Sequence, residues 1–194
     1  MWKQLIPGLR MTILLTVLTG VIYPFVVTGI CQLLFPEQAN GGLIMRNGKV
    51  IGSKLIGQNF SQPEYFQPRP SAAGSGGYDA SNSSGSNLGP TSKKLIDRTK
   101  AAVAKLRADN PARSTDAIPA DLATASASGL DPDISPASAA LQVNRVAKER
   151  RAQPGDIASL VNQHTEGRDL GFLGEPRVNV LLLNLALDER FPIR

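Results

Sequence analysis

Residues 11–35, MTILLTVLTGVIYPFVVTGICQLLF, decide the fold, because the chain has no charged side chain between Arg10 and Glu37. As an α-helix rising about 1.5 Å per residue, this stretch is about 37 Å long, which exceeds the roughly 30 Å hydrocarbon core of a bilayer. Its threonines can return their hydroxyls to backbone carbonyls, and Gly20, Pro24 and Gly29 are tolerated where neighbouring helices satisfy the freed backbone groups. We therefore predict a transmembrane helix over residues 11–35.

Two other interpretations of this stretch fit less well. A cleaved signal peptide has an apolar region of about 7–15 residues followed by a small-x-small site. Here the apolar run is longer, and it ends in Phe35-Pro36-Glu37. The buried core helix of a soluble protein is normally shorter than this run. A retained membrane anchor is therefore the preferred interpretation.

The residues that flank the helix predict its orientation. The N-terminal tail, residues 1–10, contains Lys3 and Arg10 and no acidic residue. Short cationic tails stay in the cytoplasm, whereas long domains cross largely regardless of their charge. We expect a single-pass protein of the cell inner membrane, with a cytoplasmic tail at 1–10 and a periplasmic or extracellular domain at 36–194.

Composition limits what this exported domain can do. The chain of 194 residues has a net charge of +5, and Lys3 and Arg10 supply two of its 21 basic residues, which leaves +3 outside the anchor. That charge is too small to indicate nucleic-acid binding. The single cysteine, Cys31, lies in the anchor, so no disulfide can stabilise the domain. With 5% aromatic residues, 18 Gly and 14 Pro, we expect a modest core that depends on partner subunits.

The pattern along residues 36–194 predicts one mixed α/β (α+β) domain. Two apolar runs flank Asn47-Gly48, a strong signal for a β-hairpin over 41–60. Residues 61–91 form a long loop rich in Gly, Ser and Asn, which by composition is either a flexible linker or a functional loop. The conformation of its segment 73–82 stays open.

Helical signals dominate the rest of the domain. Apolar spacing predicts a helix over 92–109, and Ser135-Pro136 is a typical helix start. Pro119 opens a short turn or helix, and a further helix begins at Gly155-Asp156 and ends at Gly167. The apolar run 176–187 suits a helix, which we favour, although a strand also fits 178–188.

The sequence lacks the motifs of the common enzyme classes. Its one histidine, His164, cannot build a zinc site without a cysteine outside the anchor, and no nucleophile elbow or phosphate-binding P-loop occurs. We therefore predict no catalytic or metal site. The competing class is a membrane-anchored DNA-binding regulator, with 136–151 and 156–166 as a helix-turn-helix, but the predicted orientation places this pair outside the cytoplasm.

An ordered set of short segments resembles the KdpC family, the C subunits of Kdp high-affinity potassium-transporting P-type ATPases. The anchor contributes YP (23–24) and FP (35–36), and 73–82 is less typical of the family. The other matching segments are GSKLIGQNF (52–60), YF (65–66), RPSA (69–72), SGSNLG (84–89), PADL (119–122), ASASGLD (125–131), ISP (134–136), QVNRVA (142–147), GEPRVNV (174–180) and LNLALD (183–188).

The resemblance implies a non-catalytic subunit, one membrane span and an external domain of mixed α/β character. Its implied partners are a channel-like potassium-binding subunit (KdpA), an ATP-hydrolysing subunit (KdpB), a small membrane subunit (KdpF) and the lipid bilayer. The implied role is assembly of the complex and action as a catalytic chaperone that raises the ATP affinity of the ATPase subunit. The chain has no cofactor of its own, since ATP and K⁺ act on the complex.

The resemblance also suggests site residues. It implies that Gln142 lies near nucleotide, which conflicts with the orientation predicted from the tail, because ATP is scarce outside the cytoplasm. Arg69, Ser86 and Asn87 are candidates for a partner interface. Arg69 could instead pair with an internal carboxylate, and Asn87 could cap or cross-link a loop.

Overall fold

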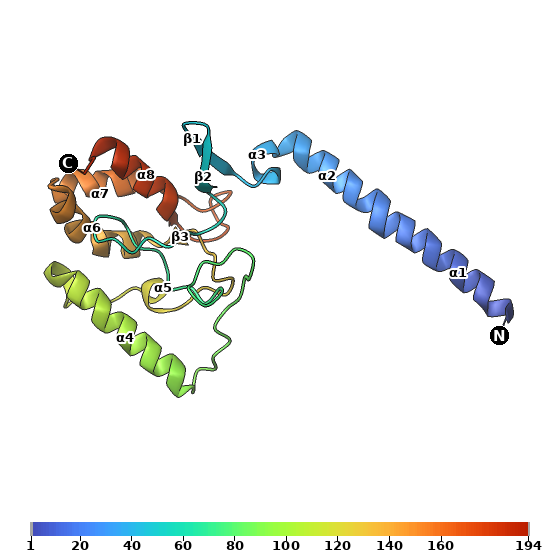
Figure 1. Ribbon diagram of the computed structural model, residues 1–194, viewed down its shortest axis with the longest axis horizontal. Helices are drawn as coiled ribbons and strands as arrows, with labels where there is room; N and C mark the ends of the chain where they lie inside the picture. Colours follow the sequence, from blue (N-terminus) through green and yellow to red (C-terminus); the bar gives the residue numbers. More distant parts are fainter. Residues whose placement is uncertain (1, 194) are drawn as a thin grey trace. The chain divides into compact units, whose positions relative to one another are not determined.

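The computed structural model describes residues 2–193 (Figure 1). The chain divides into two compact units, the first ending at Ile51 and the second beginning at Gly52. The first unit contains one long apolar helical segment, and the second contains helices around a small sheet. This division confirms the predicted fold class, a long N-terminal apolar helix followed by a mixed α/β domain.

The long helical segment consists of α1 (Trp2–Val17), a π-helical turn η1 (Leu18–Ile22) and α2 (Tyr23–Leu34). Within Lys3–Leu34, an apolar window of 18 residues has a mean hydropathy of 2.2, and none of that window is buried. By length and composition it can cross a membrane. The helix begins earlier than the predicted stretch 11–35 and takes in the cationic tail.

The π-helical turn is explained by Pro24. A proline in a helix lacks an N–H, and its ring clashes with the carbonyl four residues earlier. Here the backbone N–H of Tyr23 donates to the carbonyl of Leu18, five residues back, so the turn widens directly before the proline. The hydroxyls of Thr12 and Thr19 donate to carbonyls one turn earlier, at 3.0 and 2.6 Å, as the sequence predicted.

After α2, the chain continues with a short helix and a hairpin whose second strand crosses the boundary between the two units. These are α3 (Pro36–Ala39), β1 (Leu43–Arg46) and β2 (Lys49–Ser53). Asn47 and Gly48 lie between the two strands with φ of 51° and 75°. A two-residue hairpin turn of type I′ requires positive φ at both of its central residues. The predicted hairpin is confirmed.

The second unit is helical around three short strands. Its elements are α4 (Lys93–Asp109), the 3₁₀-helix η2 (Pro111–Arg113), α5 (Ala120–Ala123), β3 (Asp133–Ile134), α6 (Pro136–Arg150), α7 (Pro154–Gln163), β4 (Thr165–Glu166), β5 (Arg177–Asn179) and α8 (Val180–Arg190). The antiparallel sheet has the order β3-β5-β4, with Val178 opposite both Ile134 and Thr165. The helix predicted over 92–109 and the short helix after Pro119 are confirmed.

Helices α6, α7 and α8 enclose the core of this unit (Figure 1). Ser135 begins α6, because its hydroxyl accepts the backbone N–H of Ser138 at 3.1 Å and Pro136 occupies the first helical position. The three helices and β5 contribute many of the fully buried apolar side chains, including Val146, Ile157, Leu160, Val178, Leu183 and Leu187.

Two predicted boundaries are wrong. Helix α7 ends at Gln163 rather than at Gly167, because Thr165 and Glu166 pair with β5 as strand β4. The apolar run 176–187 is neither all helix nor all strand. It is divided at Asn179, which closes β5 and whose side chain accepts the N–H of Leu182 to begin α8.

The long loop between β2 and α4 is packed into the second unit rather than flexible. No helix or strand occurs between Ser53 and Lys93, all of which lies in the described part of the chain. Phe66 and Ala73 are nevertheless completely buried, and the hydroxyl of Ser71 donates to the carbonyl of Gly129, outside the loop, at 2.6 Å. Composition alone suggested a linker, whereas contacts with distant residues fix this loop in place.

Candidate functional site

Residues 63–67, which we call the clasped segment, are bound through their backbone by four buried polar side chains. Gln142, Arg145 and Arg150 come from α6, and Asn184 comes from α8. Buried polar groups cost free energy unless they are hydrogen-bonded. In this segment the loop backbone supplies at least one hydrogen-bond partner to each of the four side chains.

Asn184 binds the centre of the clasped segment. Its Oδ1 accepts the N–H of Phe66 at 2.9 Å, and its Nδ2 donates to the carbonyl of the same residue at 3.0 Å. The side-chain amide therefore satisfies both backbone polar groups of Phe66, which lies outside any helix or strand. The ring of Phe66, fully buried, joins the core of the second unit.

Gln142 binds the next residue in the same manner. Its Oε1 accepts the N–H of Gln67 at 2.8 Å and the Nη2 of Arg145 at 2.7 Å. Its Nε2 donates to the carbonyls of Gln67 at 3.1 Å and Ser138 at 3.3 Å. All four hydrogen-bonding positions of the amide are in use, and the residue has 0% exposed surface.

Two arginines hold the start of the clasped segment. The Nη1 of Arg145 donates to the carbonyls of Pro63 and Tyr65, the latter at 3.0 Å, and burial lowers the pKa of this arginine. The Nε of Arg150 donates to the carbonyl of Glu64 at 2.9 Å.

Arg150 also ties the segment to the end of the chain. Its Nη1 donates to the carbonyl of Phe191 at 2.9 Å, and its Nη2 pairs with Asp188 at 2.8 Å. The guanidinium carbon lies 4.7 Å from the centre of the Tyr65 ring, whose hydroxyl donates to the same carboxylate at 3.2 Å. Burial and the Asp188 carboxylate raise the pKa of Tyr65.

A second cluster lies beyond the clasped segment, around Arg69. Its Nη1 pairs with Asp131 at 2.6 Å, and its carbonyl accepts the hydroxyl of Tyr78 at 2.5 Å. Burial and the Asp131 charge raise the pKa of Tyr78 well above its usual range. Burial, followed by the same charge, also raises the pKa of Asp133. Arg69 therefore pairs with an internal carboxylate, which is one of the alternatives that the sequence left open.

The predicted site residues lie in different environments. Gln142 is in the interior, Arg69 is half-buried and pairs with Asp131, Ser86 is half-buried, and Asn87 is exposed with a left-handed φ of 50°. The sequence did not identify Asn184, Arg145 and Arg150 as site residues. One signal could have found the first of these, since Asn184 is a lone amide within the apolar run LLLNLAL.

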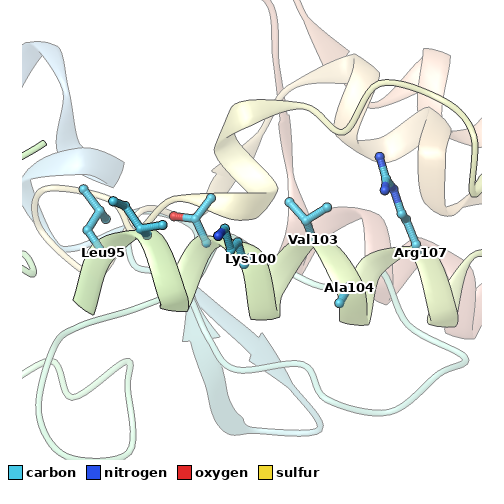
Figure 2. A pocket seen from close by; sticks show the side chains of 7 residues that line it. Leu95, Lys100, Val103, Ala104 and Arg107 are labelled. Atoms are coloured by element: carbon cyan, nitrogen blue, oxygen red, sulfur yellow. The ribbon is translucent and has the colours of Figure 1, made fainter. Parts of the chain in front are cut away.

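The part of the chain from 2 to 193 contains no cluster of three or more His, Cys, Asp or Glu side chains suited to a metal ion. An open groove runs along one face of α4 and is lined by Leu95, Ile96, Thr99, Lys100, Val103, Ala104 and Arg107 (Figure 2). These side chains all come from a single helix and include no carboxylate or nucleophile pair.

Comparison with known proteins identifies the family. The family model described as "KdpC: K+-transporting ATPase, c chain" matches residues 5–189. The chain is 59% identical over 188 residues to the potassium-transporting ATPase KdpC subunit of Gemmatimonas aurantiaca, covering 97% of this chain and 94% of the relative. It is 56% identical to that of Dechloromonas aromatica (94% and 95%) and 54% identical to that of Koribacter versatilis (100% and 98%).

The chain therefore belongs to the KdpC family, the c chains of K⁺-transporting ATPases. This confirms the resemblance drawn from the short ordered segments. The family match also displaces the DNA-binding alternative, and two of the basic side chains of its first helix, Arg145 and Arg150, are buried and bound to loop carbonyls.

Proposed function

We propose that the chain acts as the non-catalytic, membrane-anchored subunit of an ATP-driven potassium uptake complex. The observation that carries this proposal is the family match over residues 5–189, at 54–59% identity to KdpC subunits along nearly their whole length. The partners proposed are the channel-like potassium-binding subunit, the ATP-hydrolysing subunit and the small membrane subunit of the complex. ATP and K⁺ bind to these partners, and the chain needs no cofactor of its own.

The proposed topology follows from charge. Lys3 and Arg10 keep the N-terminus in the cytoplasm, the apolar helix crosses the inner membrane, and residues 36–194 lie on the outer side. The chain then has no direct access to cytoplasmic ATP. Any rise in the ATP affinity of the ATPase subunit is transmitted through contacts between subunits.

The hydrogen bonding of Gln142 supports this indirect role. A nucleotide contact requires a free donor or acceptor, and all four positions of this amide are engaged inside the domain. We propose that Gln142 fixes the loop that presents Arg69, Ser86 and Asn87 toward a neighbouring subunit. The nucleotide contact implied for Gln142 stays a prediction, which the substitution Gln142→Leu tests.

Growth and purification together test this function. Removing the chain from a strain that depends on this transporter should abolish growth at limiting potassium, and the full-length chain should restore it. A tagged chain should co-purify from membranes with much larger membrane proteins and should hydrolyse no ATP when purified alone. Normal growth without the chain, or ATP hydrolysis by the chain alone, would contradict the proposal.

A further inference from the structure

The loop between β4 and β5 exposes a group of large apolar side chains. Among the described residues of the second unit, Leu170 and Phe172 are the most exposed of this kind, at 83% and 69%, and Leu173 is 49% exposed. We call residues 170–173 the apolar tip. Single exposed apolar residues are common on soluble proteins, whereas a contiguous group indicates a contact surface.

Backbone hydrogen bonds hold the apolar tip in a defined shape. The N–H and carbonyl groups of Asp169 and Leu173 bond to each other in both directions, each at 2.9 Å, and so close a tight loop. Leu170 has a left-handed φ of 53°, a conformation that Gly or Asn adopts at lower cost. The backbone conformation at this position therefore does not favour leucine. What leucine contributes is its side chain, which the loop exposes to solvent.

Ion pairs surround the apolar tip. Arg168 pairs with Glu175 at 2.7 Å, and Arg177 pairs with Glu166 at 3.0 Å and with Asp169 at 3.2 Å. An apolar centre with a polar, solvent-accessible rim is the typical anatomy of a protein–protein contact. A few buried apolar anchors usually supply most of the binding energy in such contacts.

The charge of the loop selects the kind of partner. Residues 165–177 contain three acidic and two basic side chains, a net charge of −1, and no Trp, Tyr or Lys that would anchor them among lipid headgroups. By contrast, α4 contains six basic and two acidic residues. Both arginines of the loop already pair with carboxylates, so the apolar tip has no unpaired cation to offer anionic headgroups, and it suits a protein pocket better than a bilayer surface.

We propose that Leu170, Phe172 and Leu173 insert into an apolar pocket, with a polar or basic rim, on the outer surface of a larger subunit of the same transport complex. This inference rests on the proposed function, because it requires the complex and its orientation. In the assembled complex, the contact converts the exposed apolar tip into a buried anchor. The tip is thus a docking element that is separate from the clasped segment.

A retention experiment tests the docking contact. The double variant Leu170→Asn/Phe172→Ser keeps a residue that tolerates the left-handed turn and removes both apolar anchors. Ile96→Ser on α4, where Ile96 is 43% exposed, is the matched control. We expect the tagged double variant to retain at least tenfold less of the larger subunits from detergent-solubilised membranes, with an unchanged melting temperature, and the control to retain wild-type amounts.

The outcomes separate this inference from the proposed function. If the wild-type chain retains no partner subunit, the proposed function fails. If the wild-type chain and the double variant both retain the partners, only the docking inference is overturned. A photo-crosslinking phenylalanine analogue at position 172 identifies the occupant. A covalent product with a larger membrane subunit supports the inference, and products only with lipid or with a second copy of this chain overturn it.

Discussion

The substitution Gln142→Leu separates a structural role for this glutamine from a nucleotide contact. Leucine has a similar volume but no hydrogen-bonding group, so four hydrogen bonds are lost: those to the N–H and carbonyl of Gln67, to the Nη2 of Arg145 and to the carbonyl of Ser138. An unpaired buried group costs about 1–3 kcal/mol. Because Gln67 is half-buried and water can reach part of it, we expect a total loss of about 3–5 kcal/mol in the free energy of unfolding.

The assay is urea unfolding of the purified full-length chain in detergent, followed by thermal unfolding. For a domain of this size, a loss of 1 kcal/mol lowers the melting temperature by about 2–4 °C, so the variant should melt about 10 °C lower. Gln163→Leu is the control, because Gln163 is exposed and should change stability by less than about 0.5 kcal/mol. A variant Gln142→Leu that unfolds like the wild type, while the assembled complex loses ATP affinity, would refute the structural role.

Four further substitutions test other parts of the structure. Arg150→Met should destabilise the chain by about 3 kcal/mol or more, because the buried guanidinium binds two backbone carbonyls and a carboxylate; a loss below 1 kcal/mol by urea unfolding would contradict this. Burial and a neighbouring carboxylate raise the pKa of Asp133 in the folded chain above its ordinary value of 3.8. The stability that this group contributes is therefore lost as pH rises through the folded pKa. Asp133→Asn should raise the melting temperature at pH 7 but not near pH 3.8. Gly129→Ala should lower the free energy of unfolding by about 3 kcal/mol, and Gly174→Ala by about 1 kcal/mol. Both glycines have positive φ, but only a Cβ at position 129 would lie 2.6 Å from the Ser84 carbonyl oxygen. Equal losses would show that this crowding is irrelevant.

Local chemistry explains which parts of the fold the sequence predicted. The long apolar run, the Asn47-Gly48 turn and the Ser135-Pro136 helix start each depend on residues next to one another. Helix α4 is similarly marked by its own apolar spacing and by the Asn110-Pro111 stop. These elements form where composition and spacing indicated.

The clasped segment could not be predicted in the same manner. The two hydrogen bonds between Phe66 and Asn184 join residues 118 positions apart, and those between Gln67 and Gln142 join residues 75 positions apart. A prediction from local composition detects only the Gly, Ser and Asn residues of this loop, and it therefore indicates a flexible linker. The family resemblance marked Gln142 as important, but its role becomes visible only when its four partners are known.

The apolar tip shows a related limit of sequence patterns. Leu170, Phe172 and Leu173 look like core residues in the sequence, and no periodic pattern distinguishes them from the buried leucines of α8. Only the tight closure between Asp169 and Leu173 places their side chains in solvent. Exposure of apolar groups is thus a three-dimensional observation.

We propose that this KdpC-family chain works from outside the cytoplasm, through contacts with other subunits rather than with nucleotide. The most direct test is a pair of reporters fused to the C-terminus of the full chain, one active only in the periplasm and one active only in the cytoplasm. We predict activity from the periplasmic reporter and none from the cytoplasmic reporter. The reverse result would contradict the claim, because it would place Gln142 and the whole second unit on the side where ATP is abundant.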